Sequence, residues 1–131
     1  LHAGAYIAPF TAGWRKDMGV TMVGVFGNND GEKFGLKSRF AELGDIHRAP
    51  HPFDYAGKRF LMLHEPDEVD ALQASGHYDV IVYGHTHEID VREDKTVVIN
   101  PGETGGWTTG RGTVALLDLD SMGVEIVDLC V

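Results

Sequence analysis

Short runs of apolar residues that stop at a glycine occur twice along the chain. The first covers residues 20–26, is rich in β-branched side chains and ends at Gly27. The second covers residues 80–83 and ends at Gly84. Continuous apolar runs of this length are typical of strands that are buried on both faces. We therefore predict two buried strands, each leading directly into a loop that begins with glycine.

One segment has the spacing of an amphipathic helix. Leu36, Phe40 and Leu43 lie at positions i, i+4 and i+7 with mostly polar residues between them. Gly44 follows and is expected to end this helix. The other predicted elements are a helix over 8–18, a hairpin of strands 53–55 and 59–64, a short helix that begins at 69 and closes at Ser75-Gly76, and strands over 89–92, 96–100, 113–119 and 124–131.

The composition fits one domain. The chain has 131 residues, of which 43% are hydrophobic, enough for one core and too few for two independent domains. No stretch approaches the roughly 20 apolar residues of a membrane helix, and no secretory signal opens the chain, so we expect a soluble, cytoplasmic protein. Cys130 is the only cysteine, which excludes an intrachain disulfide and a cysteine-based zinc site. We predict a single α/β domain over residues 1–131.

The charge argues against a nucleic-acid-binding surface. The formal net charge is −9, whereas phosphate backbones are bound by clustered lysine and arginine. A chain of this charge would need bound divalent cations to handle a phosphate ester. Seven histidines are present, and we assign four of them to surface or loop positions without a role in a site: His2, His47, His51 and His77. The other three follow predicted strands.

Candidate metal ligands stand where three predicted strands end. They are Gly27-Asn28-Asn29-Asp30, His64 and Gly84-His85-Thr86-His87. The carboxyl ends of strands in an open α/β sheet meet at one edge, so these loops are expected to converge. Imidazole nitrogen and amide oxygen bind divalent transition metals, and the glycine that opens each of the two longer motifs lets the backbone turn tightly beneath an ion. We predict a metal site made of these side chains: Asn28, His64, His85 and His87.

Each motif alone has a simpler interpretation. His-x-His is common in polar turns. Gly-Asn-Asn-Asp is also a plausible turn, because Asn and Asp tolerate left-handed backbone conformations and bond their own backbone. The order of the whole set, with each polar group at a strand exit, favours a metal site over unrelated turns.

Four segments of the chain resemble a known motif series. They are Gly27-Asn28-Asn29-Asp30-Gly31, Leu63-His64, Tyr83-Gly84-His85-Thr86-His87-Glu88 and Asn100-Pro101-Gly102-Glu103. In this order they resemble the motifs of calcineurin-like metallophosphoesterases, in particular the small prokaryotic phosphodiesterase branch. The resemblance implies an α/β fold of two packed β-sheets flanked by helices. It also implies two divalent metal ions, commonly manganese, nickel, iron or zinc, between the sheets.

The resemblance assigns roles to the candidate ligands. Asn28, His64 and His85 are similar to the ligands of the second metal, and His87 is similar to a ligand of the first. In the family a water or hydroxide held by the ions attacks phosphorus in line. Two neighbouring cations lower the pKa of bound water and stabilise the entering and leaving oxygens. The resemblance therefore implies a metal-dependent phosphodiesterase that acts on a small phosphodiester and forms a homo-oligomer.

The chain departs from the family at the first metal. The family opens with a strand ending in Asp-x-His, and we expect that strand and its helix, about 30 residues, to be missing here. The family's Gly-Asp motif, whose carboxylate bridges the ions, appears as Gly4-Ala5. A methyl group cannot coordinate a cation or offset the repulsion between two cations. We expect one usable metal site and impaired activity, whether the chain is a fragment, an engineered form or a naturally degenerate member.

Asn29 takes the place of a histidine that donates a proton to the leaving group in many relatives. An amide is not a general acid near neutral pH, so we expect esters with good leaving groups, such as aryl phosphodiesters, to be preferred. We predict that Asn29 binds a phosphoryl oxygen, with a turn-forming asparagine as the alternative. Glu88 and Glu103 are candidates to orient the ligating histidines. Arg111 is assigned to solvent, and Trp107 to packing or an interface.

Two other functions remain open. A catalytically degenerate protein-interaction module on the same scaffold, comparable to the retromer subunit with this fold, is supported by Ala5 and the missing Asp-x-His segment. A nuclease, as found in the wider superfamily, is the weaker alternative because the chain is acidic and has no basic stripe. Metal content and a stable partner would test the first alternative, and oligonucleotide binding would test the second.

Overall fold

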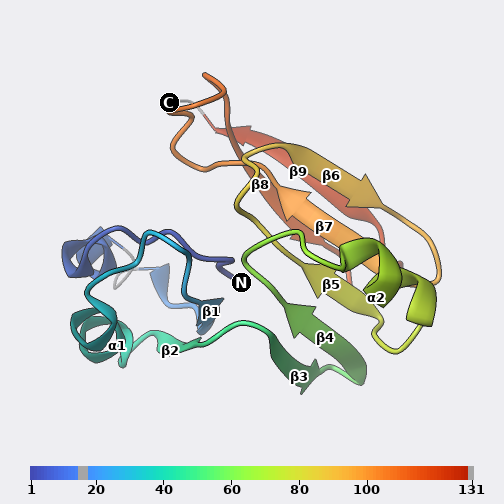
Figure 1. Cartoon of the computed structure of the whole chain (residues 1–131), viewed down its shortest axis with the longest axis horizontal. Coiled ribbons are helices and arrows are strands. Elements are labelled where there is room, and N and C mark those ends of the chain that lie inside the picture. The colour runs from blue at the N-terminus through green and yellow to red at the C-terminus, as the bar shows by residue number, and fades with distance from the viewer. Residues whose placement is uncertain (15–17, 130–131) are drawn as a thin grey trace.

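The computed structural model describes residues 1–14 and 18–129, which fold into stacked layers of strands and helices (Figure 1). In chain order the elements are the 3-10 helix η1 (Pro9–Trp14), β1 (Met22–Val25), α1 (Lys33–Phe40), β2 (Gly44–His47), β3 (His51–Tyr55), β4 (Lys58–Met62), α2 (Val69–Ser75), β5 (Val80–Val82), β6 (Ile89–Arg92), β7 (Val97–Pro101), β8 (Gly112–Leu117) and β9 (Val124–Leu129). Within the described residues no helix is long and apolar enough to cross a lipid bilayer.

The strands form one large and two small sheets. The large sheet has the order β3-β4-β5-β7-β6, and the small sheets are β1-β2 and β8-β9. β4, β5 and β7 run parallel, while β3 and β6 close the two edges in antiparallel pairing. β1 pairs in parallel with β2, and His2 forms a parallel bridge to Gly24. Because parallel strands open their carboxyl ends at one edge, the loops after β4 and β5 start side by side.

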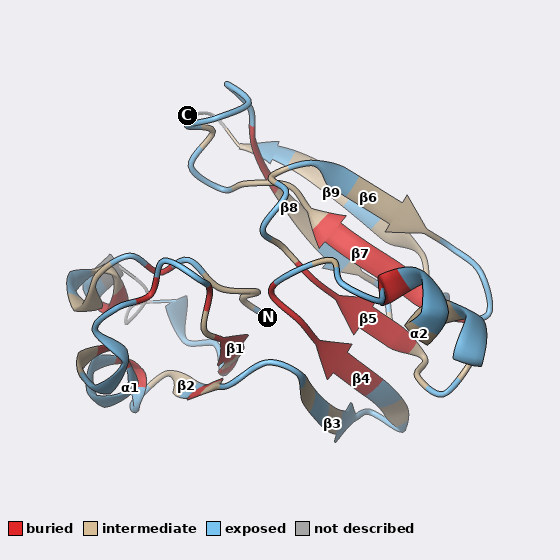
Figure 2. Cartoon of the chain, in the orientation of Figure 1, coloured by how far each residue is buried: buried red, intermediate tan, exposed pale blue. Residues whose placement is uncertain are grey.

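The main core lies between the large sheet and the two small ones. One face of the large sheet contributes most of its buried side chains, and β1 adds Val25. The members from the large sheet are Phe60, Met62, Val80, Val82, Val97 and Ile99. Partly buried residues from the small sheets pack against them: Val23, Ala115, Leu117 and Val124. Two β-layers therefore face each other, which confirms the predicted sandwich; the buried stretches of β4, β5 and β7 lie at its centre (Figure 2).

Helices cover the outer faces of the layers. α2 covers a second cluster on the other face of the large sheet: Leu61, Leu63, Val69, Ile81, Tyr83 and Val98. On the opposite side of the molecule, Leu36 and Phe40 of α1 are fully buried with Ile46 of β2. Each such burial contributes about 1.5–3 kcal/mol. Packing rather than capping holds α1, because its N-cap residue Glu32 makes no side-chain cap hydrogen bond.

Most predicted elements are confirmed with shifted ends. The two predicted buried strands are β1 and β5, the amphipathic helix is α1, and the hairpin is β3-β4. The helix predicted over residues 8–18 is wrong in type, since residues 9–14 form a 3-10 helix, and residues 15–17 lie outside the described part. Pro9 and Gly13 both disfavour a continuous α-helix there. The strand predicted to reach residue 131 is described as far as Leu129, and Cys130 lies outside the described residues.

The sequence pattern does not predict β2. Gly44, expected only to end a helix, begins this strand with a φ of 156°. A Cβ at Gly44 would lie 1.7 Å from the carbonyl oxygen of Met22, so glycine is what allows β2 to pair with β1. His47 and His51, which the sequence assigns to surface or loop positions, lie in strands rather than in loops. They are half-buried residues of β2 and β3, and their rings stack with centroids 3.6 Å apart.

Arg92 of β6 joins α2 to the large sheet. Its Nε and Nη2 donate to the carboxylate of Asp90 over 2.8–3.1 Å, and its Nη1 donates to Asp70 at 2.5 Å and to Gln73 at 3.1 Å. The hydroxyl of Tyr83 donates to the same Asp90 carboxylate at 2.6 Å. The hydrogen bond from Arg92, assisted by Tyr83, lowers the pKa of the Asp90 carboxyl, while burial beside Asp90 raises the pKa of Tyr83 to about 12.

We expect Asp90→Asn to lower the free energy of unfolding by about 1 kcal/mol near neutral pH, because the pair is only partly buried. Folding lowers the pKa of Asp90, so its contribution is present above the unfolded pKa of about 4 and is lost as the pH falls through the folded pKa. Urea unfolding of both proteins at neutral and acidic pH measures this difference. Asp128→Asn, which removes the exposed partner of Arg111, is the control and should leave the midpoint unchanged. Equal stability of Asp90→Asn and the parent at neutral pH would contradict the prediction.

Candidate metal centre

Three loops bring Asn28, His64 and His85 together. These residues follow β1, β4 and β5. The Nε2 atom of His64 lies 2.7 Å from Oδ1 of Asn28 and 3.3 Å from Nδ1 of His85. The rings of His64 and His85 meet edge to face with centroids 5.1 Å apart. His64 is buried whereas Asn28 and His85 are exposed, so the cluster is anchored in the core and open to solvent.

The hydrogen bonds of His64 define which of its ring nitrogens is free. Its Nδ1 lies 2.7 Å from the carbonyl oxygen of Ala3, which can only accept, so Nδ1 carries the proton. In the neutral ring Nε2 then presents its lone pair toward Asn28 and His85. Metal-ligating histidines usually donate their other ring N–H to a carbonyl or carboxylate in this way. Three groups able to offer lone pairs at one place favour an electron-poor partner such as a divalent cation.

Two glycines make room for the His64 ring. A Cβ at Gly4 would lie 2.6 Å from Nδ1 of His64. A Cβ at Gly27 would lie 2.9 Å from Cε1 of the same ring and 2.5 Å from the backbone nitrogen of Ala5. The backbone of Ala5, Gly27 and the His64 ring therefore pack together at van der Waals contact. Neither glycine can gain a side chain unless the ring or the backbone moves.

Asp30 fixes the loop that carries Ala5. Its buried carboxylate accepts hydrogen bonds from the backbone N–H groups of Gly27 at 2.7 Å, Ala5 at 2.9 Å and Ile7 at 2.9 Å. The bond to Gly27 is local and fits the turn that is the alternative interpretation of Gly-Asn-Asn-Asp, whereas the other two bonds connect distant parts of the chain. Ala5 and Ile7 have φ values of 63° and 70°, a left-handed conformation that costs about 1–2 kcal/mol for such residues. The Asp30 carboxylate holds both residues in that conformation.

His87 is directed to a different partner. Among the described residues it shares no hydrogen bond or ring contact with the other three predicted ligands. Its Nδ1 lies 3.0 Å from Oε2 of Glu103 and 3.1 Å from the hydroxyl of Thr108. Burial raises the pKa of the Glu103 carboxyl, but hydrogen bonds from Thr109, Thr108 and His87 outweigh burial and lower the pKa to about 2. Glu103 therefore makes the predicted orienting contact to a histidine, His87.

Asn100 holds the loop after β5 in place by hydrogen bonds from the core. It is fully buried, and its Nδ2 donates to the carbonyl oxygen of Gly84 at 3.1 Å and to the hydroxyl of Thr86 at 2.9 Å. Its Oδ1 accepts from the backbone N–H of Gly102 at 3.1 Å. Every hydrogen-bonding end of this buried amide is thus used to join two loops. The Asn-Pro-Gly-Glu motif that contains Asn100 does not by itself indicate this positioning role.

The same loop has an unusual backbone. His85 and His87 are both left-handed, with φ values of 69° and 64°. Thr86 lies between them, and its hydroxyl accepts a hydrogen bond from the buried amide of Asn100. With the central residue fixed, the two histidines turn to separate partners, His64 and Glu103.

The donors present fit one divalent cation. Asn28, His64 and His85 supply one amide oxygen and two imidazole nitrogens, which are ligand types suited to transition metals. Within the described chain, no three His, Cys, Asp or Glu side chains are grouped so as to hold a metal ion. The cluster therefore depends on the amide of Asn28 and contains no carboxylate. Ala5 lies beside it, where the resemblance implies an aspartate.

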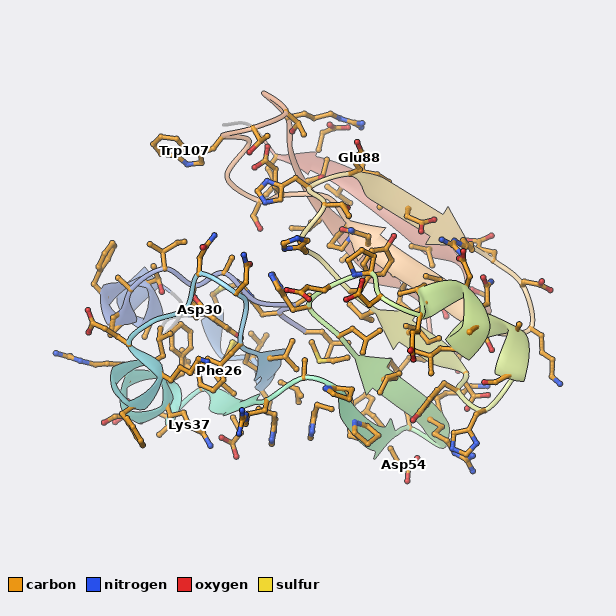
Figure 3. All side chains as sticks on the ribbon, in the orientation of Figure 1. Phe26, Asp30, Lys37, Asp54, Glu88 and Trp107 are labelled. Atoms are coloured by element: carbon orange, nitrogen blue, oxygen red, sulfur yellow. The ribbon has the colours of Figure 1, made fainter. Side chains whose placement is uncertain are left out.

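The remaining candidates lie at the rim. Asn29 is exposed beside Asn28. Glu88 points outward (Figure 3) and its side chain bonds no histidine among the described residues, so the orienting contact comes from Glu103. Trp107 is 94% exposed, which excludes a packing role within this chain and leaves the interface role as a prediction.

The α/β sandwich thus brings imidazole and amide donors together at its strand exits. Residues 1–122 match the family model described as the calcineurin-like phosphoesterase superfamily domain. The chain belongs to this family.

Individual relatives agree with this assignment. The chain is 30% identical over 125 residues to Phosphodiesterase MJ0936 of Methanocaldococcus jannaschii, a match that covers 92% of this chain and 75% of the relative. The solved structure of a novel archaeal phosphodiesterase, also 30% identical, has a TM-score of 0.90 and covers 98% of this chain and 81% of that one. Vps29 of Entamoeba histolytica in complex with Zn2+ has a TM-score of 0.60 at 15% identity, over 98% of this chain and 97% of that one. At that identity the likeness to Vps29 shows the fold alone.

Proposed function

We propose that this chain is a metal-dependent phosphodiesterase that hydrolyses small phosphodiesters with good leaving groups. The observation that carries the proposal is the convergence of Asn28, His64 and His85 at the ends of three strands. The 30% identity to a phosphodiesterase supports the same class of reaction. A scaffold function is less favoured, because the likeness to Vps29 rests on 15% identity.

Asn28, His64 and His85 would hold one divalent cation, such as manganese, nickel, iron or zinc. A cation there would supply Lewis-acid chemistry, polarising phosphoryl oxygens and lowering the pKa of water. Other residues of the chain orient two of these ligands. The Ala3 carbonyl orients the His64 ring, and Asn100 supports the loop of His85. Because the three donors are neutral, we propose weak metal binding and reduced activity in this chain.

Asn29 lies exposed beside Asn28, where its amide can donate a hydrogen bond to a phosphoryl oxygen of the substrate. The same amide cannot protonate a leaving alkoxide. An ester whose leaving group is already a weak base, such as a nitrophenolate, avoids this deficit. The exposed Trp107 supports a homo-oligomer, in which its ring would be covered.

We expect hydrolysis of bis(p-nitrophenyl) phosphate to appear when manganese or nickel is added, and to fall by about 100-fold or more in His85→Ala, which loses one of three ligands. Release of p-nitrophenolate measures the rate, and elemental analysis measures the metal retained by each protein. His77→Ala is the matched control, since His77 is exposed and outside the cluster, and it should keep full activity. No turnover with manganese, nickel, iron or zinc would overturn the proposal. A metal-free chain that purifies with a stable partner would favour the scaffold function.

A further inference from the structure

A cavity of about 610 Å³ adjoins the candidate metal centre, and Asn28 and His64 form part of its wall. Small-molecule sites typically have volumes of about 300–1,000 Å³. The cavity lies between two parts of the molecule, the segments after β1 and β2 on one side and the segments after β4 and in α2 on the other. A molecule bound at the metal centre can therefore extend into it.

The cavity has an apolar lining and a charged rim. Its apolar lining is made of buried or half-buried side chains: Phe26, Leu61, Leu63, Leu72 and Tyr78. Lys33 at the start of α1 and Arg48 in the link from β2 to β3 form the basic side of the rim. The loop between β4 and α2 forms the acidic side, with Glu65, Asp67 and Glu68. Charges of opposite sign thus come from opposite parts of the fold.

Lys33 and Arg48 are exposed, and neither has a carboxylate partner in the described part of the chain. Other basic side chains away from the cavity are paired with aspartates, among them Lys37, Arg92 and Arg111. The ammonium of Lys33 lies 5.7 Å from the centroid of the Phe26 ring. A cation–π contact of this kind places the ammonium while leaving its N–H donors available.

The overall charge makes this basic side distinctive. In a chain of net charge −9, two unpaired cations on one cavity wall create a local field of the opposite sign. An anionic group entering the cavity is attracted to Lys33 and Arg48 and repelled by the acidic rim. Hydroxyl or amino donors suit the acidic rim, and a ring suits the apolar lining between the two.

We infer that this cavity binds a second phosphate group of the substrate. This phosphate is carried on the substituent of the scissile phosphate that extends into the cavity, and not on the leaving group. The inference rests on the proposed phosphodiesterase function, which places the scissile phosphate at Asn28, His64 and His85. The substrate class is a phosphodiester that contains a ring with hydroxyl or amino donors and a second phosphate, as in esters of nucleoside bisphosphates. Lys33 and Arg48 are its specificity-determining residues.

Two chromogenic esters that differ only in the second phosphate test this inference. They are thymidine 5′-(p-nitrophenyl phosphate) and the same ester with a 3′-phosphate. We expect kcat/KM to be about tenfold higher for the 3′-phosphorylated ester, since charge-assisted hydrogen bonds to phosphate are strong. The ratio should fall to near one in a variant that carries both Lys33→Met and Arg48→Gln. Arg39→Gln, an exposed cation of α1 outside the cavity, should keep the preference.

Equal kcat/KM for the two esters, or a preference that the double variant retains, would overturn the inference while leaving the phosphodiesterase proposal intact. If no ester is hydrolysed with any added metal, the phosphodiesterase proposal fails, and binding tests the cavity alone. Calorimetric titration in EDTA then compares thymidine 3′,5′-bisphosphate with thymidine 5′-monophosphate. Tighter binding of the bisphosphate that is lost in the double variant supports the anion site. Equal binding of the two nucleotides, or binding of neither, overturns it.

Discussion

An Ala5→Asp variant should bind Mn2+ or Ni2+ at least about tenfold more tightly than the parent chain, and should hydrolyse bis(p-nitrophenyl) phosphate faster. The backbone of Ala5 packs against Gly27 and close to the His64 ring, so a side chain at position 5 starts near one of the three donors. A carboxylate there adds a negative charge to a neutral ligand set, and opposite charges about 4 Å apart attract by about 4 kcal/mol at an effective dielectric constant of about 20. The φ of 63° at Ala5 also suits Asp better than Ala.

Metal affinity is measured by calorimetric titration, and activity by release of p-nitrophenolate at saturating metal. Ala5→Asn is the matched control, because it has the shape of Asp without the charge and should gain much less affinity. If Asn and Asp raise the affinity equally, the carboxylate is not the missing element. If neither changes the affinity, position 5 does not face the cation.

Asp30→Asn should lower the free energy of unfolding by about 3 kcal/mol. Asp30 is 2% exposed, and each hydrogen bond to its charged carboxylate contributes about 1.5–3 kcal/mol. Oδ2 accepts from Ala5 and Gly27, and Oδ1 accepts from Ile7. An amide replaces one acceptor oxygen by a donor, which leaves buried N–H groups facing another N–H.

Urea unfolding measures the loss of stability, and hydrogen exchange of the Ala5 and Ile7 amides shows whether their loop opens first. Asp54→Asn is the control, because Asp54 points into solvent on β3 whereas Asp30 lies inside (Figure 3). That control should leave both measurements unchanged. A loss below about 1 kcal/mol for Asp30→Asn would mean that the loop does not depend on the carboxylate.

The pattern predicts β5 most directly, because its side chains are buried on both faces of the large sheet. Residues 80–83 can be predicted as a strand without tertiary information, because every residue in the run is apolar and is buried in the core. β2 is different, since it contains a single fully buried side chain, Ile46, and its first residue is a glycine. Its strand conformation comes from parallel pairing with β1, which is a long-range effect that no local pattern contains.

The sequence predicts those parts of the candidate site that depend only on where the strands end. The convergence of Asn28, His64 and His85 follows from their places after β1, β4 and β5. The separate direction of His87 does not, because it depends on left-handed backbone and on the buried Asn100. The long-range bonds of Asp30 were equally hidden, since an aspartate in a glycine-rich turn usually bonds only its neighbours.

The left-handed backbone of His85 and His87 lowers the thermal stability of the loop that carries a proposed metal ligand. Glycine or asparagine would adopt the same φ values with less strain, a gain of about 1 kcal/mol at each position. Laboratory evolution that selects for heat tolerance without an activity screen would therefore tend to replace both histidines. The proposed metal site would then lose its ligand His85. Engineering of this chain should keep positions 85 and 87 constant and seek robustness in the outer helices instead.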